Sequence, residues 1–199
     1  MESLSVIPLQ RLSSTPVPAE FLEPDDIETP SSLMDYELGG VALNDASQGL
    51  QVQIWRLRLV GNDVRIGSDI VPEVTLFTRN GVTELSLAFD QNMRPYVAFV
   101  QNGQAILRWY DTLAQQQVFL DLDPATITPR LCLDDKRSLQ VGGSDVILAY
   151  VKNGNLYFRA QRDRFEVEYL LQADVGGKLI RVGMNQKYRL QFLLEEIAA

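Results

Sequence analysis

The segment Tyr96–Asp111, YVAFVQNGQAILRWYD, decides the fold. Two short apolar stretches flank Asn102-Gly103, and this dipeptide is typical of type I′ hairpin turns because both central positions of that turn need positive φ. A second copy, ILAYVKNGNLYFRAQR, stands at Ile147–Arg162, 51 residues further on and without a gap. The sequence therefore predicts a β-hairpin that occurs twice.

Further strands are expected on both sides of each hairpin, because apolar and polar residues alternate there with a period of two. VTELSLAF (82–89) and QQVFLDL (116–122) flank the first hairpin, and RSLQV (137–141) and FEVEYLL (165–171) flank the second. The repeat units are then about 82–131 and 132–183. Each has four strands in about 50 residues, which is the size of a β-propeller blade.

The fold prediction is all-β, with antiparallel strands in blade-like four-stranded repeats over residues 39–199. An earlier unit is expected at about 41–78, and GKLIRVGM (177–184) and KYRLQFLLEE (187–196) form a last pair of strands. A third Asn-Gly, Asn80-Gly81, predicts one more hairpin turn. The sheets form a β-sandwich, a partial propeller with covered edges, or another barrel; about three blades are fewer than a closed propeller usually has. Because open strand edges aggregate, an oligomer is expected.

Residues 1–38 differ in composition from the rest. They contain eight acidic residues and one basic residue, and five of the nine prolines fall in the first 30 positions. Proline favours extended backbone, so this region is predicted to be an extended arm without regular structure of its own. The arm is either a solvated terminus or, since apolar residues recur between the prolines, a segment that lies along a neighbouring subunit.

Seven residues are candidates for an interface between copies. The acidic arm of one copy would contact a mixed-charge hairpin tip, RAQRDRFE, on the next. The candidate interface residues are Phe21, Leu22, Asp25 and Asp26 in the arm and Arg159, Arg162 and Arg164 in the tip.

Composition limits the chemistry that the chain can perform. The net charge of −8 argues against nonspecific nucleic-acid binding. With no histidine and one cysteine, Cys132, the chain lacks Ser-His-Asp and Cys-His catalysis, histidine-bound zinc and an internal disulfide. The pairs Asp121/Asp123 and Asp134/Asp135 supply too few oxygens for calcium. We therefore expect no enzyme, no cofactor and no metal.

The sequence also shows no secretory signal and no stretch long and apolar enough to insert into a membrane. We expect the protein to be synthesised in a cytoplasm.

The segment Gly143–Leu171, GSDVILAYVKNGNLYFRAQRDRFEVEYLL, resembles strand-rich structural proteins of tailed-bacteriophage tails, and Tyr96–Asp111 is a weaker copy of it. The resemblance covers roughly residues 82–171. It implies a virion component of the baseplate or the head-to-tail end, built into a ring or trimer with itself and other tail proteins. Propeller proteins of tails have more blades than this chain, so ring closure within one chain is not implied.

An alternative function is a carbohydrate- or receptor-binding module that takes a host surface glycan. Trp55, Trp109 and Tyr110 are the residues on which it depends, because exposed aromatic rings stack on sugars. The competing interpretation is that these rings fill the core, as aromatic residues in strands commonly do.

Overall fold

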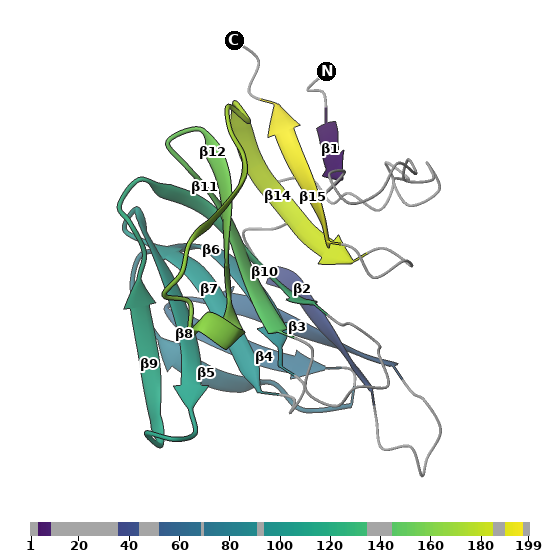
Figure 1. The fold of residues 1–199 in the computed structure, drawn as a ribbon. Coiled ribbons are helices and arrows are strands. Elements are labelled where there is room, and N and C mark those ends of the chain that lie inside the picture. The colour runs from purple at the N-terminus through teal and green to yellow at the C-terminus, as the bar shows by residue number, and fades with distance from the viewer. Residues whose placement is uncertain are drawn as a thin grey trace.

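A computed structural model describes residues 4–8, 36–43, 52–68, 70–90, 94–134, 145–184 and 190–196. The protein is all-β, as predicted, with one short 3-10 turn, η5 (Gln161–Asp163), among the described residues. The strands form four antiparallel sheets; in Figure 1 the first three are blue, teal and green, and the fourth joins the purple strand at the N-terminus to the yellow strands at the C-terminus.

Three sheets have four strands each, ordered as in the chain. The first contains β2 (Tyr36–Leu43), β3 (Val52–Val60), β4 (Asp63–Ser68) and β5 (Val74–Thr78). The second contains β6 (Val82–Phe89), β7 (Pro95–Gln101), β8 (Gln104–Asp111) and β9 (Gln116–Asp121). The third contains β10 (Thr126–Asp134), β11 (Asp145–Lys152), β12 (Asn155–Ala160) and β13 (Tyr169–Gln172).

The repeated hairpin is confirmed at β7–β8 and β11–β12. Asn102 and Gly103 have φ values of 50° and 83°, and Asn153 and Gly154 have 49° and 74°. These left-handed pairs are what a type I′ turn requires. The third sheet begins at Thr126, because β10 supplies its first strand; the expected strand at 137–141 lies outside the described residues.

The predicted hairpin at Asn80-Gly81 is wrong. The dipeptide connects β5 of the first sheet to β6 of the second, and only Gly81 has a positive φ, 76°. A Cβ on Gly81 would lie 2.0 Å from Oδ1 of Asn102. Glycine is needed there for a close approach between two turns as well as for its φ.

The four sheets stack face to face in chain order. One core cluster joins the first sheet to the second, through residues such as Leu57, Leu87 and Phe99. The next cluster joins the second sheet to the third, and the last joins the third to the fourth. The second and third sheets are thus buried on both faces, which explains their nearly continuous apolar strands. This stack differs from a two-sheet β-sandwich.

The fourth sheet unites the two ends of the chain. It contains β14 (Gly177–Met184), β15 (Leu190–Glu196) and, beside β15, the N-terminal strand β1 (Leu4–Pro8), as Figure 1 shows. The predicted arm therefore includes a strand that pairs within its own chain, with Val6 opposite Leu193. Phe21, Leu22, Asp25 and Asp26 lie outside the described residues.

Two β-bulges hold the third sheet to the fourth. One interrupts the β10–β11 register between Ile127 and Arg130, where Thr128 has a φ of 49°; the other lies in β14 at Ile180. The Thr128 Oγ1 accepts a hydrogen bond of 3.1 Å from the Leu179 N–H. The Arg130 Nε donates to the Ile180 carbonyl at 2.8 Å, so the carbonyl of a bulged residue finds its partner in the neighbouring sheet.

Arg130 also reaches the second sheet. Its NH1 donates to the Glu84 carboxylate of β6 at 2.9 Å, and the nearby Leu131 N–H donates to the Ser86 Oγ at 2.9 Å. The buried guanidinium therefore contacts three sheets.

Replacing Arg130 with methionine should lower the free energy of unfolding by about 2 kcal/mol, because the Ile180 carbonyl loses a buried donor. Urea denaturation measures the change. The control is Arg58→Met, which breaks an exposed ion pair with Glu73 and should cost at most about 1 kcal/mol. Equal losses in both variants would contradict a special role for Arg130.

A candidate ligand pocket between the second and third sheets

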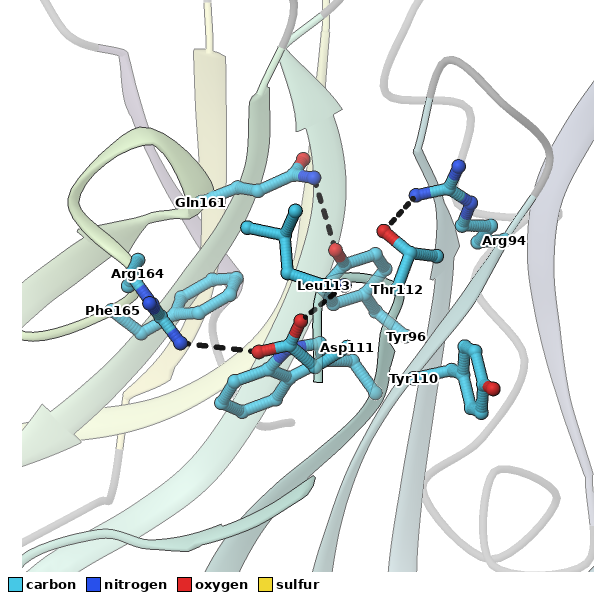
Figure 2. Close-up of a pocket in the computed structure, with 10 residues that line it drawn as sticks. Arg94, Tyr96, Tyr110, Asp111, Thr112, Leu113, Gln161, Arg164 and Phe165 are labelled. Atoms are coloured by element: carbon cyan, nitrogen blue, oxygen red, sulfur yellow. Dashed lines mark hydrogen bonds and ion pairs between the residues drawn. The ribbon is translucent and has the colours of Figure 1, made fainter. Parts of the chain in front are cut away.

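A cavity of about 190 Å³ lies where the β8–β9 turn of the second sheet meets η5 of the third. Figure 2 shows its lining side chains converging from these two sheets. They are Arg94, Tyr96, Trp109, Tyr110, Asp111, Thr112, Leu113, Gln161, Arg164 and Phe165.

Three aromatic rings form one wall of the pocket. The Trp109 ring is nearly parallel to that of Tyr96, with centroids 6.4 Å apart and 9° between the planes. Phe165 is tilted against Trp109, at a centroid distance of 5.6 Å. Alternation along β8 points Trp109 toward the third sheet, while Tyr110 is 43% exposed at the rim.

The backbone beside this wall is strained. Arg164 and Phe165 have consecutive positive φ values of 52° and 61°, which is unusual for residues other than glycine and especially for a bulky aromatic. The turn is held by hydrogen bonds from the Arg164 N–H to the Gln161 carbonyl and from the Phe165 N–H to the Ala160 carbonyl. Strain of this kind is concentrated at functional sites in proteins. Here it turns the Phe165 ring into the core and leaves the Arg164 side chain at the rim.

Asp111 accepts three hydrogen bonds within the protein. Its Oδ1 accepts hydrogen bonds from the N–H groups of Leu113 and Ala114, and its Oδ2 from the Arg164 guanidinium at 3.1 Å. The backbone hydrogen bonds, from Ala114 and then Leu113, hold the pKa of Asp111 below its usual range. The carboxylate is therefore a fixed anchor for the turn and for Arg164.

The remaining polar groups of the pocket are mainly donors. The Tyr96 hydroxyl accepts a hydrogen bond of 3.0 Å from Gln161, so its own proton is free to be donated. Burial, with the nearby Asp90 charge, raises the pKa of Tyr96 to about 12, which keeps that proton on at neutral pH. The Arg94 NH1 donates to the Thr112 Oγ1, and a guanidinium has five N–H donors in all.

The three arginines expected at an interface all have partners within the chain. Arg164 pairs with Asp111, Arg162 with Asp145 at 2.7 Å, and Arg159 with Glu168 and the Tyr150 hydroxyl. Arg162 and Arg164 keep more than half of their side chains exposed, whereas Arg159 keeps 18%. Their contact with a second copy remains a prediction.

Glu168 is the centre of the cluster that contains Arg159. Its carboxylate also accepts hydrogen bonds from Lys152 and from the Tyr150 hydroxyl. Burial by itself would raise the pKa of Glu168, but the hydrogen bonds from Lys152, Tyr150 and Arg159 outweigh it and the pKa is lowered. The carboxylate is thus held ionised between two cations.

Because its folded pKa is lowered, Glu168 contributes stability above the ordinary glutamate pKa of about 4.3, and this is lost as the pH falls through the folded value. A Glu168→Gln variant should therefore be less stable than the parent at neutral pH, and the difference should shrink in acid. Urea titrations across this range measure it. The control is Glu73→Gln, an exposed partner of Arg58, which should change stability little. A pH-independent loss for Glu168→Gln would contradict this.

Trp55 and Cys132, which the sequence analysis also considered, have structural roles in the core. Trp55 packs its ring 5.4 Å from Phe89, in the core between the first two sheets. Cys132 packs against the core between the third and fourth sheets, where burial raises the pKa of its thiol. Among the described residues, no three side chains of the metal-binding types lie together, and no helix is long and apolar enough to span a membrane.

The sequence analysis singled out Trp109, Tyr110 and Arg164 but missed the other seven pocket residues. Of these, Tyr96, Gln161 and Phe165 belong to the site through contacts between the two repeats, as with the Gln161–Tyr96 hydrogen bond across 65 positions. The strained turn after η5 gave no recognisable signal, since it contains neither glycine nor asparagine.

The fold and the pocket define this chain as an all-β protein of stacked antiparallel sheets with a cavity between its two repeats. Comparisons with protein-family models, curated proteins and solved structures found no match to it.

Proposed function

We propose that this protein is a structural subunit that assembles through its strand edges, in the virion of a tailed bacteriophage, at the baseplate or the head-to-tail end. The tail assignment is supported by the resemblance of residues 143–171. The assembly mechanism is supported by one observation, the pairing of β1 with β15 in the fourth sheet.

A terminal strand that is separated from the next strand by many residues can be shared between copies. Residues 9–35 separate β1 from β2, so β1 can reach a sheet other than its own. The hydrogen bonds along β15 are the same whether β1 comes from the same chain or from a neighbour, and exchange of an identical element is therefore a low-cost route to an oligomer. In the assembled form, we propose, β1 of one copy completes the fourth sheet of the next.

The arrangement of the sheets supports a partial propeller as the assembling unit. The first strands of consecutive sheets contact one another in chain order: β2 with β6, β6 with β10, and β10 with β14. Inner strands of propeller blades are neighbours in the same way. In the fourth sheet β1 is an edge strand beside β15, so its replacement by β1 of a neighbour leaves the other strands of the sheet in place.

Strand exchange predicts a cross-link between chains. Val6→Cys combined with Leu193→Cys places two thiols at opposed positions of β1 and β15, where oxidation should form a disulfide. Dimers or longer species that disappear on reduction are expected on a denaturing gel. The single variant Val6→Cys is the control.

The same proposal predicts the mass in solution. Light scattering should give a discrete oligomer for the full chain and a smaller species for a chain without residues 1–35, a deletion that removes β1 and keeps β2 whole. A disulfide formed only within single chains, together with a monomeric mass for both proteins, would refute strand exchange.

A second candidate function is favoured by the pocket. Trp109 is partly exposed in its wall and Tyr110 stands at its rim, so two rings remain available for stacking on a sugar. We propose this carbohydrate-binding module, for a host surface glycan, as the alternative; it is compatible with a place in a tail.

The carbohydrate alternative predicts a change in the fluorescence of Trp109. In a Trp55→Phe variant, Trp109 is the only tryptophan, and a bound sugar should change its emission. A Trp109→Phe variant, which keeps the core Trp55, is the control and should show no response. Absence of any response over a panel of neutral and acidic sugars would refute this candidate.

A further inference from the structure

We infer that the pocket between the second and third sheets binds an acidic sugar. Arg94 and Arg164 would recognise the carboxylate that such a sugar carries as a substituent on its ring. This inference rests on the carbohydrate-binding alternative and goes beyond it by naming the class of sugar.

The balance of hydrogen-bonding groups supports an anionic ligand. The carboxylate of Asp111 is occupied by two backbone N–H groups and by Arg164. The Gln161 side chain is likewise used on both sides, since its Oε1 accepts from the Val146 N–H and its Nε2 donates to Tyr96. The acceptor groups of these two side chains are thus already engaged within the protein.

The donors, in contrast, exceed their partners. Arg94 uses its NH1 on a neutral hydroxyl, and Arg164 uses its NH2 on Asp111 while 66% of its side chain is exposed. The Tyr96 hydroxyl has a proton to donate. The lining contains two guanidinium groups and one carboxylate, that of Asp111, while a second carboxylate, that of Asp90, lies near Tyr96. A ligand that brings a carboxylate would accept hydrogen bonds from the guanidinium groups and the Tyr96 hydroxyl.

Shape favours a single ring as the rest of the ligand. A volume of about 190 Å³ is small, and it is bounded by a tryptophan and a tyrosine with nearly parallel rings. Figure 2 shows Arg94 and Arg164 on opposite sides of the pocket, with Asp111 and Leu113 between them. A sugar ring with a carboxylate can contact the aromatic rim and one of the two guanidinium groups at once. Leu113, which is 91% exposed, provides a further apolar contact at the rim.

The test compares glucuronate with glucose, which differ by a carboxylate. Trp109 emission in the Trp55→Phe background, together with titration calorimetry, gives the dissociation constants. Glucuronate should bind at least about tenfold more tightly, as expected for a charge-assisted hydrogen bond, and the difference should decrease with added salt.

Variants of the two arginines connect the preference to the pocket. The double variant Arg94→Gln, Arg164→Gln should lose the tenfold preference and keep weak binding of glucose. Arg164→Lys alone should retain most of the preference, because the charge remains. The matched control is Arg58→Gln, an exposed ion-paired arginine on the first sheet, which should leave both sugars unaffected. Unchanged thermal unfolding of the double variant shows that the fold is kept.

The outcomes separate the inference from the functions on which it depends. Equal binding of both sugars would overturn the acidic-sugar inference and leave the carbohydrate module standing, whereas binding of neither would overturn both. Competition by acetate as strong as by glucuronate would also overturn the inference, because the ring would then contribute nothing. The structural-subunit proposal is tested separately by the cross-link and the solution mass.

Discussion

The guanidinium of Arg130 connects three of the four sheets, and the stack depends on the two bulges that it joins. A β-sheet normally uses all its backbone groups inside the sheet and meets another sheet only through side chains. In β10 the positive φ of Thr128 interrupts the pairing with β11. In β14 the bulge at Ile180 leaves its carbonyl free to accept a hydrogen bond from the neighbouring sheet. Side chains of β10 then bind backbone groups of β14 directly. These hydrogen bonds add directional contacts to the apolar packing between the two sheets.

The same hairpin occurs in both repeats, but the side chains around its arginine are mainly apolar in one and charged in the other. Arg108 and Arg159 occupy equivalent positions on β8 and β12. Arg159 lies among Tyr150, Lys152 and Glu168, whose counterparts 51 positions earlier are Phe99, Gln101 and Gln117. Arg108 instead lies over the Phe77 ring, where burial lowers its pKa. A few side chains thus decide whether the same backbone position carries a salt bridge or a buried cation beside an aromatic ring.

Most of the fold could be predicted from the sequence, because its information is local. Alternation and the Asn-Gly turns gave the hairpins, and the 51-residue repeat gave the four-stranded units. The same dipeptide misled at Asn80-Gly81, because the choice between a hairpin and a crossover depends on where the next strand pairs. The pairing of Leu4–Pro8 with β15 could not be predicted either, since it joins opposite ends of the chain. Long-range pairings of this kind leave no signal in local periodicity.

The pocket exists because the two repeats end differently. In the second sheet β8 continues to Asp111, whereas β12 of the third sheet stops at Ala160 and η5 begins at the next residue. The shorter strand and its strained turn place Gln161, Arg164 and Phe165 against the end of β8, and the cavity is the space between them. A perfectly repeated pair of sheets would bring two equivalent strand ends together and would have neither the turn nor its arginine. The site is therefore a property of the difference between the repeats.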